Sequence, residues 1–424
     1  MNAAERVRFV RGQIPSEGLF AGATWRISPE AFPISQELIA KLEVLGPQLL
    51  AFYRTCNVMY RYSVAGKLPR WIADYLDAGK PRELIELSRA ERIKSHIPRV
   101  IRPDVILTNE HFFITELDSV PGGIGLTGWL GKTYAELGDN VIGGATGMME
   151  GFSAAMQIEK HPLAVVVSEE SATYRPEMEW LGQQVGFRVM KPEEWNATHP
   201  SVYRFFELFD LPNVPNGGEM LAGSATPPPK PQLEEKMLFA FLWLPQLEGF
   251  WREQLGPKTT EELRRIFPRT WLVDPTPLPP HAVIPDLGIN DWREMAGFSQ
   301  KQRELVLKIS GFHEHAWGAR GVFVGHDLSA ADWAEAIERA RASFPRNPFI
   351  LQRFEKSRLV EARYFDFETD EVREFKARVR LCPYYFVVGD AARLGGILAT
   401  ICPADKKLIH GMPDAVMSPC RAQS

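Results

Sequence analysis

Two short candidate strands separated by one helical stretch constrain the fold of this chain most strongly. Residues 163–167 read Leu-Ala-Val-Val-Val, which is typical of a buried strand, and residues 187–189 form a second candidate strand. The residues between them, 175–185, favour a helix. A strand, a helix and a strand in this order are typical of a parallel sheet, because parallel neighbours need a long crossover. The sequence therefore predicts an α/β fold with a small parallel sheet.

The rest of the chain indicates more than one domain. A length of 424 residues fits about two to three domains. Apolar spacing favours helices over 34–62 and 82–97 and an amphipathic helix from about Leu233 past Trp243. Residues 359–400 look like antiparallel strands, and Ser329 is a candidate N-cap for a helix to about Ser343. We expect four segments: a helical N-terminal region 1–98, a hairpin and glycine-rich segment 99–150, a parallel-sheet domain with a proline-rich linker 151–231, and a further α/β part 232–424.

Composition and charge exclude several classes of protein. Hydrophobic residues make up 45% and charged residues 24%, so the chain is expected to fold around a large core. A formal net charge of −4 argues against nonspecific nucleic-acid binding, which needs a positive field. The four cysteines form no CxxC pair, and the longest apolar run falls far short of the roughly 20 residues that span a membrane. We therefore expect a cytoplasmic protein without nucleic-acid or membrane partners.

The segment 305–325 carries a pattern suited to phosphate binding. Residues 305–310 form an expected strand that bears Lys308, a loop with glycines follows, and residues 322–324 form a second strand. A lysine supplies a point charge, and glycines let backbone N–H groups approach phosphate oxygens closely. No GxxxxGK[ST] run is present, so this is not a P-loop. The alternative, which spacing alone favours, is a solvated lysine at a strand end.

Acidic residues gather on a predicted hairpin that begins near residue 103. Asp104 lies on its first strand, and Glu116 and Asp118 lie at the end of the second. Residues i and i+2 of a strand share a face, so Glu116 and Asp118 project together. Carboxylate oxygens from neighbouring strands suit a hard cation such as Mg²⁺. The alternative is a hairpin whose charged faces are simply solvated.

Two arginines alternate on a later strand. Arg378 and Arg380 are two residues apart, so their side chains share one face. A guanidinium fork matches the oxygens of a phosphate or an acyl phosphate. The sequence therefore makes both arginines candidates for stabilising a transferred phosphoryl group. A strand with a polar outer face explains the same pattern equally well.

The segment 305–325, together with the strand that follows near residue 350, resembles the nucleotide-binding half of the ATP-grasp family. The resemblance rests on the strand of Lys308, the loop through Gly325, and residues 349–355, which read Phe-Ile-Leu-Gln-Arg-Phe-Glu. Glu235-Lys236, upstream, is similar to the family's first nucleotide lysine. The resemblance implies that lysines hold the ATP phosphates, that loop glycines cover them, and that a hinge contacts adenine and ribose. The lysines are Lys236 and Lys308, and the loop glycines are Gly318 and Gly321. The hinge residues are Gln352, Phe354 and Glu355.

The order of the motifs resembles a circularly permuted ATP-grasp protein. In the ordinary order the metal-binding strands follow the hinge, whereas here Arg102-Pro103-Asp104 and Glu116-Leu117-Asp118 come some 200 residues earlier in the chain. This order is similar to the synthetase portion of glutathionylspermidine synthetase and its relatives. Residues 161–210 also resemble the small sheet domain that precedes the ATP-binding parts, and residues 232–424 would supply the nucleotide-binding subdomains. Asp118 stands where the family more often has asparagine, which still offers oxygen.

The resemblance implies an ADP-forming carboxylate–amine ligase that uses ATP and Mg²⁺. Asp104, Glu116 and Asp118 would hold the metal, and Arg378 or Arg380 would stabilise the transferred group. The partners would be a small-molecule carboxylate and an amine, with amino acids or peptides among the candidates. Two alternatives stay open: a regulatory ATP-binding protein without ligase activity, and a small-molecule kinase.

Overall fold

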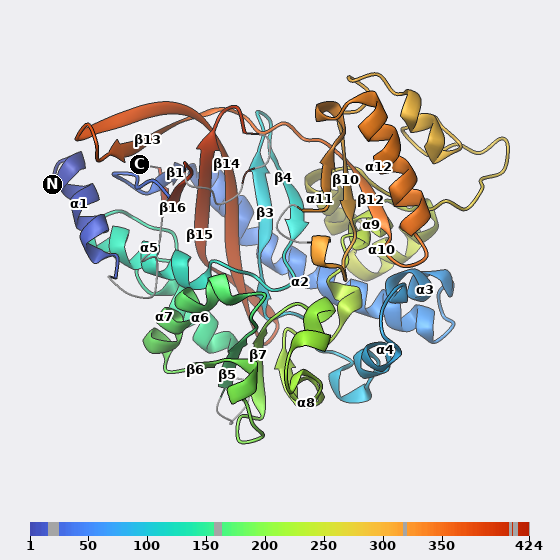
Figure 1. Ribbon diagram of the computed structural model, residues 1–424, viewed down its shortest axis with the longest axis horizontal. Helices are drawn as coiled ribbons and strands as arrows, with labels where there is room; N and C mark the ends of the chain where they lie inside the picture. The colour runs from blue at the N-terminus through green and yellow to red at the C-terminus, as the bar shows by residue number, and fades with distance from the viewer. Residues whose placement is uncertain (16–24, 157–162, 317–319, 407–408, 410–413, 424) are drawn as a thin grey trace. The chain divides into compact units, whose positions relative to one another are not determined.

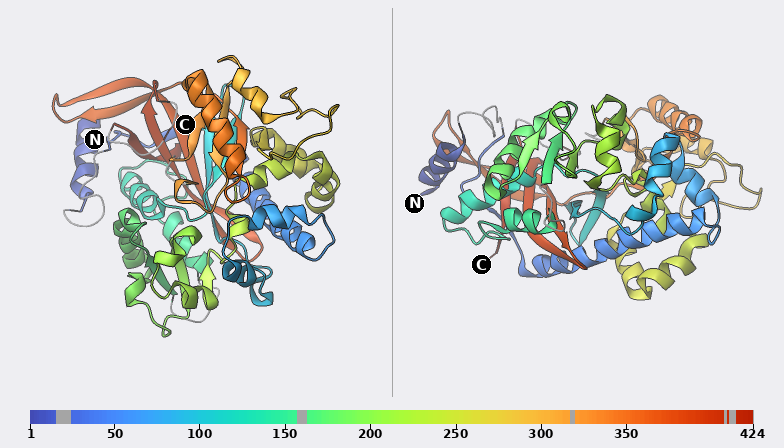
Figure 2. Two further views of the ribbon diagram at one scale, coloured as in Figure 1. Left: turned by 45° about the vertical axis from the view of Figure 1, so that its right-hand side comes forward. Right: turned by 90° about the horizontal axis from the view of Figure 1, so that it is seen from below.

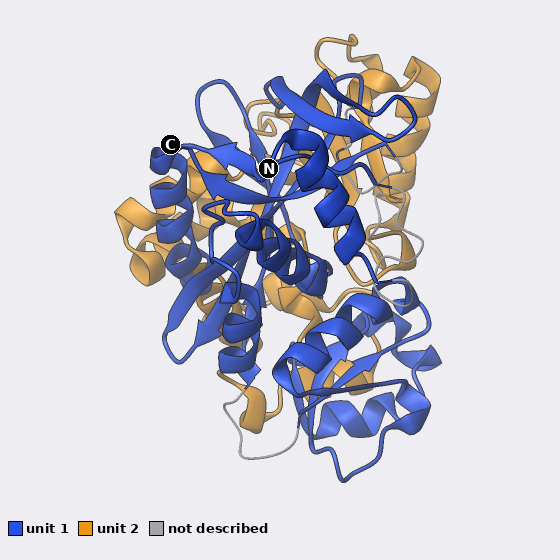
Figure 3. Ribbon diagram, turned by 90° about the vertical axis from the view of Figure 1, so that its left-hand side faces the viewer, with its two compact units in different colours: residues 1–51, 96–229, 357–424 blue, residues 52–95, 230–356 orange. Residues whose placement is uncertain are grey.

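The computed structural model describes residues 1–15, 25–156, 163–316, 320–406, 409 and 414–423. The chain divides into two compact units, each built from segments that are far apart in the sequence (Figure 3). Unit 1 contains residues 1–51, 96–229 and 357–424, and unit 2 contains residues 52–95 and 230–356. The four segments expected from the sequence stay a prediction, because these units group residues by packing rather than by chain order.

Unit 1 contains an eight-stranded sheet in which two long strands, β14 and β15, lie side by side (Figure 1). Its main path runs β1-β16-β15-β14-β3-β4, and β2 and β13 also pair with β14. All pairs except β1 with β16 are antiparallel, which confirms the antiparallel character predicted for 359–400. The strands are β1 Phe32–Ile34, β2 Val100–Ile101, β3 Pro103–Leu107, β4 Phe112–Leu117, β13 Val360–Asp366, β14 Glu371–Val388, β15 Ala391–Pro403 and β16 Val416–Ala422.

Helices cover both faces of this sheet because consecutive side chains of a strand point in opposite directions. Tyr384 and Phe386 of β14 face helices α5 (Ile124–Glu136) and α6 (Gly147–Met156), which lie along one side of the sheet (Figure 2). The intervening Tyr385 donates its hydroxyl to the carbonyl of Leu42 at 2.6 Å. Leu42 belongs to helix α2 (Gln36–Val64), so the first part of α2 packs on the opposite face.

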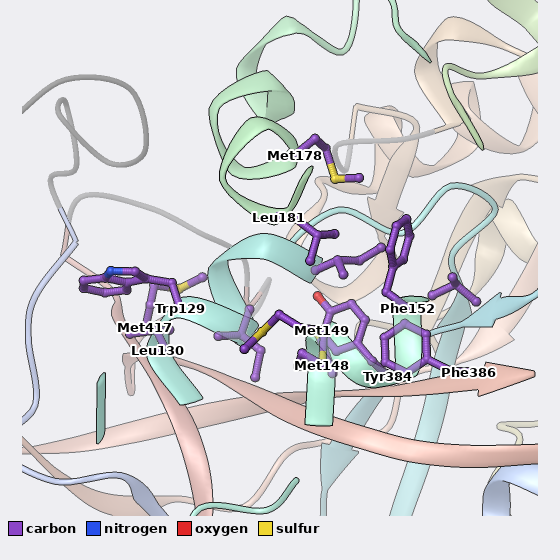
Figure 4. Packing of buried hydrophobic residues seen from close by; sticks show 14 of the residues in the cluster. Trp129, Leu130, Met148, Met149, Phe152, Met178, Leu181, Tyr384, Phe386 and Met417 are labelled. Atoms are coloured by element: carbon purple, nitrogen blue, oxygen red, sulfur yellow. The ribbon is translucent and has the colours of Figure 1, made fainter. Parts of the chain in front are cut away.

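The glycine-dense stretch after residue 121 forms two helices that pack very closely. A Cβ on Gly125 would overlap the carbonyl of Glu177, and one on Gly151 would overlap the ring of Phe386. Glycine therefore lets α5 approach helix α7 (Arg175–Val185) and lets α6 approach β14. The core between these elements is filled by large side chains, among them Phe152 and Tyr384 (Figure 4).

The second sheet of unit 1 confirms the predicted parallel sheet. Its strand order is β6-β5-β7-β8, all three pairings are parallel, and α7 connects β5 to β6. Ligands of such sheets bind beyond the carboxyl ends of the strands, near the point where the strand order reverses. The elements are β5 Leu163–Val167, β6 Arg188–Met190, β7 Ser201–Phe205, α8 Gly217–Ala222 and β8 Ser224–Thr226.

Unit 2 is built around a four-stranded antiparallel sheet of order β11-β10-β12-β9. Helix α12 packs its buried residues into the core of this sheet, and its Ser329 cap accepts the N–H of Asp332 as predicted. The elements of this unit are α3 Trp71–Asp77, α4 Arg82–Ser88, α9 Met237–Trp243, α10 Glu248–Leu255, α11 Pro257–Ile266, β9 Thr270–Leu272, β10 Leu305–Ile309, β11 Val322–Val324, α12 Ala330–Ser343 and β12 Phe349–Arg353. Helix α1 (Ala3–Gln13) belongs to unit 1.

Two helix predictions need correction. The helix expected from Leu233 is wrong in character: α9 begins at Met237 and its residues through Leu242 are all buried, so it has no polar face. The helix expected over 82–97 ends at Ser88, and only a short 3₁₀ turn, Glu91–Ile93, follows.

Among the helices that the structure describes, none is both long and apolar enough to cross a membrane.

Candidate functional site

The predicted acidic hairpin forms in unit 1 and brings its carboxylates close together. Asp104 on β3 lies directly opposite Glu116 on β4, next to an irregularity in the strand pairing. Beyond β4, the N–H of Asp118 donates to the carbonyl of Arg102 at 3.0 Å, so the ladder extends past the strand. Arg102 then reaches both aspartates, with Nη2 3.2 Å from Asp104 Oδ1 and 2.6 Å from Asp118 Oδ2.

A second arginine completes this cluster from the neighbouring strand. Arg380 lies on β14 opposite Ile106 of β3, and its Nη1 donates to Asp104 Oδ2 at 2.8 Å. The side chain of Asp104 is only 9% exposed, so these charges interact with little screening by water. Three carboxylates and two guanidinium groups give the cluster of Arg102, Asp104, Glu116, Asp118 and Arg380 a formal charge of −1.

The protonation behaviour of the cluster follows from its burial. Burial raises the pKa of Asp118 above its usual value, Arg102 opposes this shift, and the carboxylates of Asp104 and Glu116 add to it. Burial alone would lower the pKa of Arg380, but the carboxylate of Asp104 holds it above the ordinary value. A bound cation would favour the ionised form of Asp118, because it would supply the positive charge that the cluster lacks.

The cluster fits a hard cation by its donor atoms. Asp104, Glu116 and Asp118 offer carboxylate oxygens, which Mg²⁺ prefers. Across the part of the chain that the structure describes, no group of three or more His, Cys, Asp or Glu side chains is arranged to hold a metal ion. A cation here would therefore need Arg102 to give up part of its contact with the aspartates. The metal site stays a prediction.

The two predicted arginines of β14 occupy different surroundings. Arg380 contacts the carboxylate cluster, whereas Arg378 donates Nε to the carbonyl of Ala404 at 2.9 Å. Arg378 also donates Nη1 to the carbonyl and the hydroxyl of Ser357. The shared face of the strand was visible in the sequence, but the neighbours of each guanidinium group depend on which segments lie beside β14 at that point.

In unit 2, Lys308 lies buried in the sheet rather than in solvent. Its Nζ donates to Oε1 of Gln352 at 3.0 Å, and Nε2 of Gln352 donates to the hydroxyl of Thr270 at 3.2 Å. Lys308 is 7% exposed and Gln352 is 2% exposed. The three side chains come from β10, β12 and β9, which are neighbours in the sheet. This polar chain across three strands is an unusual feature of an otherwise apolar sheet.

The loop after β10 contains two of the predicted phosphate-covering residues. Nζ of Lys236 donates to the carbonyl of Ala316 at 2.7 Å, which ties the upstream lysine to this loop. A Cβ on Gly321 would lie 2.5 Å from the carbonyl of His315, so only glycine fits there without a shift. Gly318 lies outside the described residues. The structure therefore brings Lys236 and this loop together, and their roles toward phosphate stay a prediction.

The expected adenine and ribose hinge follows β12. Phe354 packs its ring against His326, with ring centroids 4.7 Å apart. Burial raises the pKa of the Glu355 carboxyl above its usual value, and Arg353 opposes that shift. Gln352, the third predicted hinge residue, accepts a hydrogen bond from Nζ of Lys308. The roles of all three in nucleotide binding stay a prediction.

Sequence reasoning missed one buried carboxylate in unit 1. Glu177 on α7 accepts the N–H of Gly123 at 2.6 Å and the N–H of Leu126 at 2.9 Å, so it caps the first turn of α5. Burial raises its pKa to about 7, although both backbone N–H groups and Arg102 oppose the shift. No sequence signal could have found it, because its partners lie more than 50 residues earlier in the chain.

Comparison with known proteins supports the fold. No protein-family model matches the chain, and no curated protein sequence matches it either. A solved structure of a glutathione synthetase-like effector (GSS30) from Globodera pallida is similar, with a TM-score of 0.52 at 12% identity over 94% of this chain and 90% of the other. A candidate gamma-glutamylcysteine synthetase from Methylobacillus flagellatus matches with a TM-score of 0.42 at 11% identity over 90% and 87%. The first likeness shows that the chain has a mixed α/β fold similar to that of a synthetase-like protein.

Proposed function

We propose that this chain is an ATP- and Mg²⁺-dependent carboxylate–amine ligase with a circularly permuted ATP-grasp architecture. The observation that carries the proposal is the partly buried cluster of Arg102, Asp104, Asp118 and Arg380, which gathers acidic and basic groups at one end of a hairpin. Burying charges is costly unless they are paired, as they are here, and clusters of paired ionisable groups out of water are found preferentially at functional sites. In unit 2, the hydrogen bond from Lys236 to the loop after β10 supports the proposed nucleotide-binding part of the site.

The proposed reaction has two steps and needs no nucleophile from the protein. A substrate carboxylate oxygen attacks the γ-phosphorus of ATP, the bond from that phosphorus to the β,γ-bridging oxygen breaks, and ADP leaves. An amine then attacks the carbonyl carbon of the acyl phosphate, the carbon–oxygen bond breaks, and inorganic phosphate leaves while the amine loses a proton. Positioning and charge stabilisation are what a protein contributes to such transfers.

The residues of unit 1 would stabilise the negative charge on the phosphoryl group that is transferred in the first step. Mg²⁺, when bound by Asp104, Glu116 and Asp118, would neutralise charge on the phosphate oxygens. Arg380 is already oriented and partly desolvated, so it can stabilise the transferred group without a large reorganisation. Arg378 remains a candidate for the same role, although its contacts with backbone carbonyls would have to change.

The residues of unit 2 would hold the nucleotide. Lys308 and Lys236 would contact the α and β phosphates, and the loop with Gly318 and Gly321 would cover them. Burial strengthens the interaction of the Lys308 ammonium with an anion, because the local dielectric constant is lower than that of water. Gln352, Phe354 and Glu355 would contact adenine and ribose.

The proposed substrates are a small carboxylic acid and a small amine, with amino acids and short peptides as the first classes to test. The direct experiment mixes the protein with MgATP and pools of both, measures ADP release, and searches for new amides by mass spectrometry. Lys308→Ala should abolish ADP release while the protein stays folded. Lys301→Ala changes an exposed lysine just before the same strand and should leave ADP release unchanged.

Each result separates the proposed ligase from its alternatives. A new amide together with ADP supports the ligase. ADP with a phosphorylated product, and no hydroxamate when hydroxylamine is added, would identify a kinase instead. MgATP binding without ADP release in any pool would favour a regulatory ATP-binding protein. Near-normal turnover in Lys308→Ala would contradict the assigned nucleotide site.

A further inference from the structure

A buried ion pair in unit 2 links a segment without any predicted role to the nucleotide lysines. Lys80 lies between α3 and α4, and its Nζ is 2.5 Å from Oε1 of Glu235. Each side chain is 1% exposed. Glu235 immediately precedes Lys236, so the ion pair lies one residue from a lysine proposed to bind the nucleotide. Nothing in the sequence pattern of 52–95 indicated such a contact.

The other oxygen of Glu235 connects the pair to the strand that bears Lys308. Glu235 Oε2 accepts the hydroxyl of Ser310, which follows Lys308 by two residues. The Ser310 hydroxyl in turn accepts the N–H of Met237 at 2.9 Å, and the Ser310 carbonyl accepts the N–H of Lys236 at 2.8 Å. Ser310 is fully buried. The backbones on both sides are therefore held together by hydrogen bonds that centre on one serine and one glutamate.

Lys80 also reaches the beginning of the covering loop. Its Nζ lies 5.5 Å from the ring centroid of Phe312, which has a positive φ of 45°. A cation over an aromatic face is attracted by the ring. The preceding Gly79 has a φ of 71°, and a Cβ there would overlap the carbonyl of Arg346. This close approach fixes the backbone from which Lys80 extends.

We propose that Lys80 is a positioning residue for ATP binding, through Glu235 and Ser310. Its ammonium group fixes the Glu235 carboxylate, the carboxylate fixes Ser310, and Ser310 sets the distance between the segments that carry Lys236 and Lys308. The N-terminal helical segment of unit 2 thus contributes an internal cation that preorganises the phosphate-binding lysines. This inference rests on the proposed function, because it assigns a role toward the same nucleotide.

A positioning role predicts a specific pattern of binding. Residues that orient the groups in contact with a ligand usually change affinity about 10- to 100-fold when they are replaced. Lys80→Met alone would leave the Glu235 carboxylate buried without its cation, and that change by itself threatens folding. The double variant Lys80→Met/Glu235→Gln removes both charges and keeps an acceptor for the Ser310 hydroxyl, so it isolates positioning from loss of fold.

The test measures MgATP affinity by isothermal titration calorimetry and amide exchange at Lys236 and Met237 by mass spectrometry. For the folded double variant we expect binding about 10- to 100-fold weaker than wild type and faster exchange of these two amides. Lys80→Arg keeps the cation and should bind close to the wild-type level. Lys67→Met replaces an exposed lysine of the same segment and should change neither quantity.

The outcomes distinguish this inference from the proposed function. A folded double variant that binds MgATP as tightly as the wild type would overturn the role of Lys80 and leave the proposed function intact. A Lys80→Arg variant that keeps its fold and wild-type amide exchange but binds MgATP as weakly as the double variant would also overturn it. If the wild-type protein does not bind MgATP, the proposed function fails and the role of Lys80 toward ATP fails with it.

Discussion

Burial of the Glu177 carboxyl makes the stability of the folded state depend on pH. Its carboxylate is buried on α7 and accepts the N–H groups of Gly123 and Leu126, which lie just after the acidic hairpin. Burial raises its pKa to about 7 from an ordinary 4.5. The folded state therefore holds a proton between these values that the unfolded state has released. Stability from this group is fully present below pH 4.5 and is lost as the pH rises through about 7.

The magnitude follows from the two pKa values. The rise from 4.5 to about 7 corresponds to about 3 kcal/mol in all, most of which falls between pH 5 and pH 8. This corresponds to a change on the order of 100-fold in the opening equilibrium of the segment that Glu177 caps. The Asp118 carboxyl, whose pKa is also raised, changes stability in the same direction. A variant at Glu177 is therefore needed to assign the effect.

Hydrogen exchange reports this opening directly. Exchange of peptides that cover 120–130 is measured at pH 5 and pH 8, corrected for the intrinsic rates, under conditions in which reclosing is faster than exchange. We expect wild-type protection to fall on the order of 100-fold between the two pH values, and Glu177→Gln to remove most of that fall. Glu179→Gln changes an exposed carboxylate on the same helix and should behave as wild type. Equal protection of the wild type at both pH values would refute the reasoning.

Three further predictions concern the hairpin and the core of unit 1. Glu116→Ala should lower ADP formation more than about 100-fold without unfolding the protein, which circular dichroism checks; near-normal turnover would contradict its role. Asp104→Asn leaves two partly buried guanidinium groups without their shared carboxylate, although Arg102 keeps Asp118, and should cost about 1–3 kcal/mol in urea unfolding, whereas Glu110→Gln on the exposed turn should cost almost nothing. Gly151→Ala pushes a methyl group into an aromatic ring of β14 and should lower the thermal midpoint, at a cost of about 1–3 kcal/mol. Gly12→Ala in the open part of α1 should be neutral or slightly stabilising, and an equal loss in both variants would argue against close packing.

The sequence alone determined the local elements and where the candidate motifs lie on them. The β3–β4 hairpin, the β5-α7-β6 unit and the capped helix α12 all follow from patterns within a few residues, because strand alternation and helix caps are local properties. Helix α9 was misjudged because apolar and polar positions in a short helix do not reveal whether every side of it will be covered. The glycine-rich helices α5 and α6 were not foreseen, since glycine weakens helices unless close packing requires it.

Only the tertiary structure decided which groups meet. Arg378 and Arg380 look equivalent in the sequence, yet β3 lies beside one of them, and the carbonyls of Ser357 and Ala404 lie beside the other. The contacts of Glu177 with α5 and of Lys80 with Glu235 likewise join segments about 50 and 155 residues apart. Such contacts depend on strand register and on how distant segments pack. A sequence pattern specifies the face on which a side chain lies, but the partner on that face is supplied by the fold.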